Sequence, residues 1–282
     1  MDSFSDFGSK LSKYTFTRQI GAGGFGTVYE ANDDLFKVYA IKIVYIDNDD
    51  IQLLVNNEIN VLTYLKEKGC VKNILCLIEI IYNKNKKRIA LVTQYVDGMD
   101  MVDFINENFS DLTTDVVKLI FQNIIKAIYY ITQHGICHND LKPENIMILS
   151  DYNVVIIDFG LSCLIRQELS KLYPISKCNT IMGGTPNYTS PEKQKNVVVD
   201  QVKSEVFSLG VIFYYTLTQN LPFKRNDNML NDITKLKTEE NYTGYPDELY
   251  QLTKDMMKYN YKDRPDLVTI YDKLHLNEVS VI

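Results

Sequence analysis

The sequence predicts an α+β protein whose first third is mainly antiparallel sheet and whose remainder is mainly helical. Two observations support this division. Short segments that alternate apolar and polar residues, separated by glycine-rich or Asn/Lys-rich turns, occupy residues 14–94, whereas apolar residues recur at helical spacing over much of the following chain. With 282 residues, 45% of them hydrophobic, the chain is long enough for one large domain or a two-lobed one.

Composition argues against several classes of protein. The longest apolar runs, such as residues 154–157, are far shorter than the roughly 18 residues that span a bilayer. The amino terminus lacks the basic start and apolar core of a secretion signal, and no prenylation cysteine closes the chain, so we expect a soluble intracellular protein, cytoplasmic or nuclear. A net charge of -6 and a pI near 5.2 disfavour a nucleic-acid partner, a local basic patch aside, and suit basic protein substrates.

Cysteine usage indicates neither a zinc site nor a disulfide framework. No two cysteines have Cys-x-x-Cys spacing, so reduced thiols are expected throughout. The five cysteines are Cys70, Cys76, Cys137, Cys163 and Cys178.

The first glycine cluster is predicted to join two strands. Strand alternation over residues 14–20 is interrupted by Gly21-Ala22-Gly23-Gly24-Phe25-Gly26 and resumes over residues 27–31. A dinucleotide-binding fingerprint would open a helix instead. Because glycine lacks a Cβ atom, backbone amides in such a hairpin can approach nucleotide phosphates closely, although this spacing alone also fits a flexible hairpin.

A lysine within the next strand requires a partner. Lys42 lies in the apolar run 39–44, where a buried ammonium without a counter-charge would be costly. The helix predicted over residues 49–66 supplies Glu58, 16 residues further on. Either residue alone is more simply an ordinary surface residue. Together with the glycine loop, the family resemblance described below implies that the two residues pair and that Lys42 contacts nucleotide phosphates. Strands at 74–82 and 88–94 complete the small sheet.

The longest helical pattern covers residues 115–134. Its apolar positions form a face wide enough to be largely buried, so we expect a core helix that supports the segment directly after it. These positions are Val116, Val117, Ile120, Phe121, Ile124, Ile125 and Ile128.

That following segment combines the residue types needed for phosphoryl transfer from a Mg²⁺-nucleotide. In this chemistry Asp140 would accept the proton of a substrate hydroxyl, and Lys142 would balance charge on the transferring group. Asn145 and Asp158 would hold the metal ions. The segment reads His138-Asn139-Asp140-Leu141-Lys142-Pro143-Glu144-Asn145, with Asp158-Phe159-Gly160 after a short apolar run.

This octet resembles the catalytic loop of protein kinases, normally His-Arg-Asp-Leu-Lys-Pro-Glu-Asn. Residues 184–192, Gly-Thr-Pro-Asn-Tyr-Thr-Ser-Pro-Glu, are similar to the end of a kinase activation loop, and Asp263-Arg264-Pro265 follows in the expected order. With matching landmarks from Tyr14 to about Leu274, the chain is identified as a member of the eukaryotic-type protein kinases. Lys142 resembles the serine/threonine branch.

The resemblance implies a bilobal kinase fold. One protein kinase domain over residues 1–282 would comprise a small, mainly antiparallel β N-lobe with helix C (14–93), a hinge (94–98) and a larger, mainly helical C-lobe (99–275). ATP with Mg²⁺, or with Mn²⁺ in its place, would be the cofactor.

The resemblance also assigns roles to residues. Asp140, Lys142, Lys42 and Glu58 would be the catalytic set, with Asn145 and Asp158 on the metal. Thr93 would be the gatekeeper, Val96 a hinge contact and Asp100 a ribose contact. His138 and a Glu192–Arg264 ion pair would be structural, and Thr185 would hydrogen-bond near Asp140. The implied nucleotide contacts are Ile20, Gly21, Ala22, Gly23, Gly24, Phe25, Gly26, Val28, Ala40, Lys42, Thr93, Gln94, Val96, Asp100 and Met147.

Three departures from the family pattern leave alternatives open. Asn139 replaces the usual arginine, Glu205 replaces the helix-F aspartate that anchors the catalytic loop, and tryptophan is absent, with Phe207 where one is common. Loss of an anchor could produce a pseudokinase that binds ATP or acts as a scaffold. A small-molecule kinase is disfavoured because residues 184–192 resemble a polypeptide-substrate platform.

Asn139 leads to an expectation about regulation. In arginine-bearing kinases that side chain gathers an activation-loop phosphate. Asn139 lacks the charge, and the usual phosphoacceptor position falls at Ile181, beside Thr180. Activity without activation-loop phosphorylation is therefore expected. The alternative is a phosphorylated Thr180 that Lys171 or Lys177 binds.

Substrate preference follows from three further positions. Glu144 and Asp100 resemble the acids that bind basic residues upstream of the phosphoacceptor, and Leu161 resembles the residue that favours serine over threonine. We expect a monomer that acts on protein substrates, without membrane or nucleic-acid partners.

Overall fold

The computed structural model describes residues 4–23, 26–165, 173–178, 183–195, 197, 200–223 and 244–274. It divides into two compact units, Met1–Asp97 and Gly98–Ile282.

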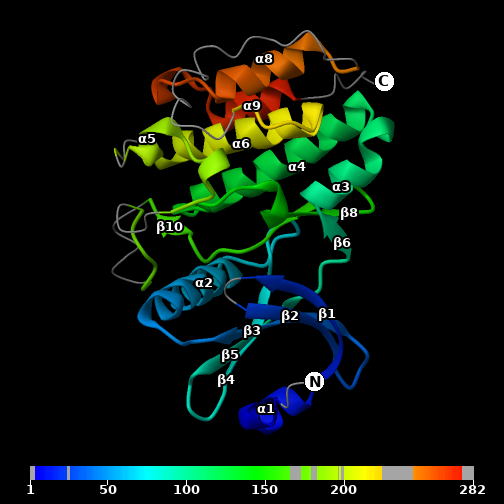
Figure 1. Ribbon diagram of the computed structural model, residues 1–282, viewed down its shortest axis with the longest axis vertical. Helices are drawn as coiled ribbons and strands as arrows, with labels where there is room; N and C mark the ends of the chain where they lie inside the picture. Colours follow the sequence, from blue (N-terminus) through cyan, green and yellow to red (C-terminus); the bar gives the residue numbers. More distant parts are fainter. Residues whose placement is uncertain are drawn as a thin grey trace. The chain divides into compact units, whose positions relative to one another are not determined.

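The first unit is built on a five-stranded antiparallel sheet (Figure 1). Its strands lie in the order β1-β2-β3-β5-β4, so the two hairpins β1–β2 and β4–β5 flank β3. The strands are β1 (Thr15–Gly23), β2 (Gly26–Asn32), β3 (Val38–Tyr45), β4 (Leu77–Tyr82) and β5 (Arg88–Gln94), preceded by η1 (Phe4–Phe7) and α1 (Ser9–Ser12). The predicted small sheet is confirmed, although β4 begins at Leu77 rather than at residue 74.

Helix α2 (Asp49–Glu67) covers part of this sheet. The Asn48 side chain accepts the Ile51 amide and so satisfies a donor at the first turn. Val55 and Ile59 pack against Val44 of β3 and Leu91 of β5. The helix is therefore held against the strand that carries Lys42.

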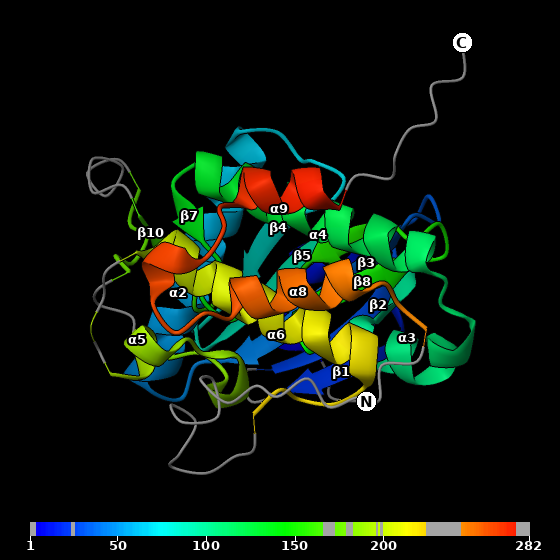
Figure 2. The same ribbon diagram turned by 90° about the horizontal axis from the view of Figure 1, so that it is seen from above.

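The second unit is mainly helical, as predicted. Helices α4, α6, α8 and α9 form its bulk, and α6 and α8 run side by side (Figures 1 and 2). The helices are α3 (Met101–Asn108), α4 (Thr114–Gln133), α5 (Pro191–Gln194), α6 (Gln201–Thr218), α8 (Asp247–Met256) and α9 (Leu267–Lys273), with short 3₁₀ turns η2 (Phe109–Asp111), η3 (Pro143–Asn145), η5 (Pro186–Tyr188) and η6 (Tyr261–Asp263).

Close packing brings the central helices together. The rings of Phe121 on α4 and Phe213 on α6 stack with centroids 3.6 Å apart. At Gly210 on α6 a Cβ atom would lie 2.8 Å from Met257 Cγ and 2.9 Å from Met256 Cβ, so only glycine allows α8 this near. The expectation of a buried core helix over residues 115–134 is confirmed by α4, whose apolar face is almost fully buried.

Two small sheets carry the loops of the second unit. One has the order β6-β8-β9 and the other pairs β7 with β10. Their strands are β6 (Gly98–Asp100), β7 (Ile136–Cys137), β8 (Ile146–Leu149), β9 (Val154–Ile156) and β10 (Cys163–Leu164). Within the described ranges, no helix has both the length and the apolar character needed to cross a bilayer.

The expectation of five reduced thiols was wrong. Disulfides join Cys70 to Cys76 and Cys163 to Cys178, while Cys137 is buried and free. Folding brings the Cα atoms of these pairs to 5.4 Å and 4.7 Å, within the range that a disulfide spans. Spacing along the chain does not reveal such proximity.

Candidate active site

The catalytic loop begins at a buried histidine. His138 is fully buried, as expected of a packed residue, and its Nε2 lies 2.9 Å from the Ile157 carbonyl oxygen. Its ring packs 5.1 Å from that of Phe159. These contacts join the loop to the residues on either side of Asp158.

Glu205 anchors the same loop from α6. Its carboxylate accepts the backbone N–H of His138 at 3.1 Å and that of Asn139 at 2.6 Å. Burial raises the pKa of Glu205, and the electrostatic interaction with the nearby His138 ring and these amide hydrogen bonds oppose the rise. The departure from aspartate therefore retains an anchoring carboxylate.

Asp140 lies among polar groups that hold its carboxylate. Its Oδ1 accepts the Thr185 backbone N–H at 2.7 Å and the Thr185 hydroxyl at 2.9 Å, while the Lys142 ammonium lies 3.5 Å from Oδ2. Asn145 Nδ2 donates to the Asp140 carbonyl at 2.8 Å. The predicted neighbourhood of Thr185, Asp140 and Lys142 is confirmed.

Asn145 and Asp158 are the predicted metal ligands. The backbone carbonyl of Asn145 accepts the Ile157 N–H at 3.0 Å, so the Asn145 backbone lies beside the residue that precedes Asp158. Asp158 has a φ of +63°, a left-handed conformation that aspartate tolerates better than most residues. Carboxylate and amide oxygens suit Mg²⁺, which is bound by one or two carboxylates with substrate phosphates rather than by a full protein cage. No group of three or more His, Cys, Asp or Glu residues that could hold a metal ion occurs in the described ranges.

In the first unit, Lys42 has the acid that it requires. Its ammonium lies 2.8 Å from Glu58 Oε2 and 3.1 Å from Oε1, joining β3 to α2. The two side chains are 20% and 6% exposed, so the pair is largely removed from water. The predicted ion pair is confirmed. Its contact with nucleotide phosphates stays a prediction.

The predicted nucleotide contacts divide between the units. Those from Ile20 to Val96 belong to the first unit, where Gly23 pairs with Gly26 in the β1–β2 hairpin and confirms that the glycines join two strands. Residues 24 and 25 lie outside the described ranges. At Gly26, where φ is +153°, a Cβ atom would lie 2.4 Å from the Ile43 carbonyl oxygen, so the close approach of β3 requires glycine.

Two predicted nucleotide contacts belong to the second unit. Asp100 and Met147 are register partners of β6 and β8. Asp100 Oδ1 also accepts the amides of Val102 and Asp103 and so caps α3. Its ribose contact stays a prediction.

The expected Glu192–Arg264 ion pair is confirmed and buried. The guanidinium binds both carboxylate oxygens, at 2.6 Å and 2.8 Å, and its side chain is fully buried. Burial raises the pKa of Glu192, but the hydrogen bonds and charge of Arg264 outweigh it and lower the pKa below its ordinary value. The Phe207 ring, in the position where tryptophan is common, lies 5.1 Å from the guanidinium carbon.

Sequence reasoning missed Lys193, which follows Glu192 in α5. Its ammonium donates to Asn139 Oδ1 at 2.5 Å and to the Asn139 carbonyl at 2.8 Å. No motif signals this contact, because the residues are 54 positions apart and lysine is unremarkable on a short helix.

The two units together carry the parts of a eukaryotic-type kinase: a sheet with a lysine–glutamate pair, and a helical unit with an anchored aspartate loop. Residues 14–275 match the family model described as protein kinase domain, and the chain belongs to this family.

Curated relatives support the serine/threonine branch. The chain is similar to "CBL-interacting protein kinase 21" of Oryza sativa subsp. japonica, at 34% identity over 76% of this chain and 39% of that protein. It is also similar to "CBL-interacting serine/threonine-protein kinase 1" and "CBL-interacting serine/threonine-protein kinase 3" of Arabidopsis thaliana. The first is 34% identical over 77% of this chain and 47% of the relative, and the second 31% over 82% and 50%. The chain therefore spans half or less of the length of these relatives.

Proposed function

We propose that this chain is an ATP-dependent serine/threonine protein kinase that transfers the γ-phosphate of ATP to hydroxyls of protein substrates. The observation that carries the proposal is the Asp140 carboxylate, which Thr185 holds by two hydrogen bonds beside Lys142. With Oδ1 occupied by these donors, Asp140 can orient an acceptor hydroxyl and take its proton. Lys142 then offsets negative charge on the group in transfer.

Asn145 and Asp158 would hold Mg²⁺, which neutralises phosphate charge when bound. Lys42, held by Glu58, would contact the α- and β-phosphates. The remaining nucleotide contacts are those predicted from the family resemblance.

The pseudokinase alternative was motivated by Glu205, but geometry favours catalysis. Glu205 reaches the two backbone amides that precede Asp140, so the loop is anchored despite the longer side chain. Lys42, Asp140, Asn145 and Asp158 all retain the residue types that phosphoryl transfer needs.

We further propose that activity does not require a phosphorylated activation loop. Residues 180–182 and Lys171, on which the alternative depends, lie outside the described ranges. Support comes from Asn139, whose side-chain oxygen and nitrogen are already occupied by Lys193 and by the Leu161 carbonyl.

A preference for basic residues upstream of the phosphoacceptor is proposed from Glu144 and Asp100. Glu144 is exposed. Burial raises the pKa values of Tyr188 and Tyr215, and the nearby charge of Glu144 raises them further. A carboxylate among these aromatic side chains suits an arginine-containing peptide. Serine is proposed over threonine from Leu161. The names of the relatives describe interaction with CBL, and half or more of each relative lies beyond the aligned region.

The test is a peptide-array assay with purified protein, ATP and Mg²⁺. Phosphate should appear on serine peptides with upstream arginine, and Glu144→Gln should reduce this preference while phosphorylation of neutral peptides continues. An array without incorporation, from protein that is folded by circular dichroism, would favour the pseudokinase.

A further inference from the structure

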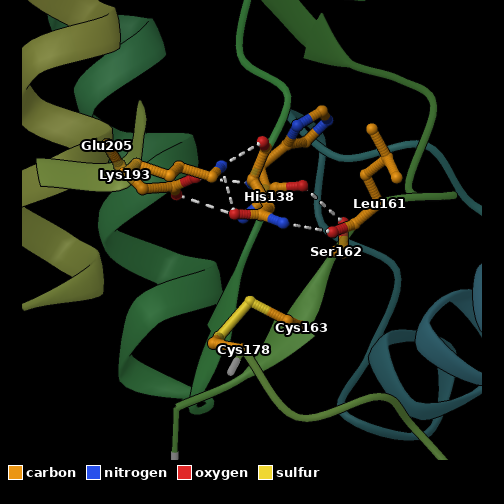
Figure 3. Close-up of a disulfide and its surroundings, with 8 residues drawn as sticks. His138, Leu161, Ser162, Cys163, Cys178, Lys193 and Glu205 are labelled. Carbon is orange, nitrogen blue, oxygen red and sulfur yellow. Dashed lines mark hydrogen bonds between the residues drawn. A yellow bond between two sulfur atoms is a disulfide. The ribbon is translucent and has the colours of Figure 1, made fainter. Parts of the chain in front are cut away.

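Lys193 places a positive charge beside the catalytic loop, next to Asn139. Figure 3 shows Lys193 and Glu205 approaching His138 from one side, with Leu161 and Ser162 on the other. The ammonium donates to both oxygens of Asn139, at 2.5 Å and 2.8 Å. Lys193 thus contacts the residue immediately before Asp140.

Asn139 joins three parts of the second unit. Its backbone N–H donates to Glu205 on α6, its Oδ1 accepts from Lys193 on α5, and its Nδ2 donates to the Leu161 carbonyl at 2.9 Å. Its φ of +72° is left-handed, a conformation for which asparagine is among the best suited residues after glycine. An arginine here would lack the side-chain acceptor oxygen that Lys193 uses.

The surrounding chain is shaped around this contact. Gly184 has a φ of +119°, and a Cβ atom there would lie 3.1 Å from the Asn139 carbonyl oxygen and 3.4 Å from Lys193 Nζ. A side chain at position 184 would crowd both atoms and would require a strained backbone conformation, so glycine is favoured where residues 184–192 approach the catalytic loop.

Charge explains why a lysine is useful here. Two carboxylates, Glu205 and Asp140, flank the backbone of residues 138–140, and both contribute favourable charge interactions with Lys193. Burial lowers the pKa of Lys193, and these two acids oppose the decrease. An ammonium between two anions reduces their mutual repulsion.

We propose that Lys193 and Asn139 are positioning residues that order the catalytic loop and the segment after Asp158 by an internal ion contact instead of a phosphate. The inference rests on the proposed kinase function and deepens it. Lys193 acts through Asn139, whose amide group holds the Leu161 carbonyl and whose backbone orients Asp140. A structural lysine without this role would affect stability alone.

Four variants separate the contacts. Lys193→Met removes the charge and keeps the aliphatic stem. Asn139→Asp keeps a side-chain acceptor for Lys193 but loses the donor to Leu161. Asn139→Gly permits the positive φ and removes both side-chain contacts, while its backbone carbonyl stays available to Lys193. Lys195→Met is the matched control, since Lys195 ends the same helix but is exposed and donates to the Tyr259 hydroxyl.

The first measurement is steady-state kinetics at a temperature where every variant is folded. Lys193→Met and Asn139→Gly should lower kcat about 10- to 100-fold, because small displacements of a catalytic group have effects of this size. KM for ATP should stay within about twofold, since neither side chain contacts nucleotide in the proposed site. The kcat of the double variant Lys193→Met/Asn139→Gly should be no lower than that of the slower single variant, because the effects of residues that act together are not additive.

The second measurement is hydrogen exchange, which does not depend on activity. Peptides covering residues 136–142 and 160–165 should lose protection in Lys193→Met and Asn139→Gly, whereas Asn139→Asp should expose only the second. Lys195→Met should match the wild type in both measurements. Unchanged protection, or a kcat for Lys193→Met equal to that of Lys195→Met, would overturn the positioning role. If the wild-type chain lacks turnover, the kinase proposal fails and exchange alone decides the positioning.

Discussion

Thr185 donates both its backbone N–H and its hydroxyl to a single oxygen of Asp140, at 2.7 Å and 2.9 Å. Its own carbonyl accepts the Thr189 hydroxyl at 2.9 Å, so the threonine is itself fixed. One carboxylate oxygen is thereby occupied, and the carboxylate is oriented by a neighbouring segment of the same unit.

Removing the Thr185 hydroxyl should slow catalysis. Thr185→Val retains shape and the backbone donor but leaves Asp140 with one hydrogen bond fewer, and we expect kcat to fall roughly 10-fold or more. Thr185→Ser is the control and should stay near wild type. Equal kcat values for the valine and serine variants would show that the hydroxyl does not orient Asp140.

Asp140→Asn should abolish most turnover without unfolding the protein. The amide oxygen can still accept from Thr185, but the group cannot take a proton, so the rate should fall by about 10²–10⁴. Wild-type turnover in this variant, with an unchanged melting temperature, would refute the assignment.

Lys42→Met should also abolish turnover, with an added effect on stability. It would leave the Glu58 carboxylate, only 6% exposed, without its lysine. Lys42→Met combined with Glu58→Gln should recover melting temperature but not activity. Recovery of activity in the double variant would argue that Lys42 serves folding alone.

Activity should survive removal of phosphate. Protein made in bacteria, treated with phosphatase and verified by mass spectrometry, should retain its turnover when assayed at once, because Asn139 is occupied by Lys193 and Leu161 rather than waiting for a phosphate. Thr180→Ala should behave alike. If both treatments silence the enzyme, the alternative with phosphorylated Thr180 is correct.

The Glu192–Arg264 pair predicts a pH-dependent contribution to stability. Glu192→Gln should lower the free energy of unfolding at pH 7 by about 3 kcal/mol, because it leaves a fully buried guanidinium without its anion. The folded-state pKa of Glu192 lies below its ordinary 4.5, so the stabilisation is complete above pH 4.5 and is lost as pH falls through the folded value. Urea unfolding should show the two proteins converging below pH 4.5. A difference that persists unchanged into acid would exclude this linkage.

The cysteines can be counted by alkylation. Denatured without reductant, the protein should label at Cys137 alone, whereas reduction first should expose all five thiols. Cys163→Ser should destabilise the second unit by up to about 3 kcal/mol, because the Cys163–Cys178 disulfide joins residues 15 positions apart and so constrains the unfolded chain. Five labelled cysteines without reductant would restore the expectation of reduced thiols.

Sequence by itself determined the two-part division of secondary structure and the pairing of charges within motifs. Period-two and period-3.6 patterns are local, so the sheet and α4 could be predicted, while the start of β4 could not, because strand ends depend on pairing. Lys42 was predicted to need an acid, since a charge in an apolar segment requires a counter-charge. The family resemblance implied Glu58 as the partner of Lys42 and Glu192 as the partner of Arg264.

Tertiary structure alone decided what holds the Asn139 side chain. Its partners Leu161 and Lys193 lie 22 and 54 residues away along the chain, and no sequence pattern predicts either contact. The disulfides depend in the same way on Cα atoms that only folding brings within reach. Hydrogen bonds and disulfides form between atoms that are near in space, and local sequence carries no signal of that proximity.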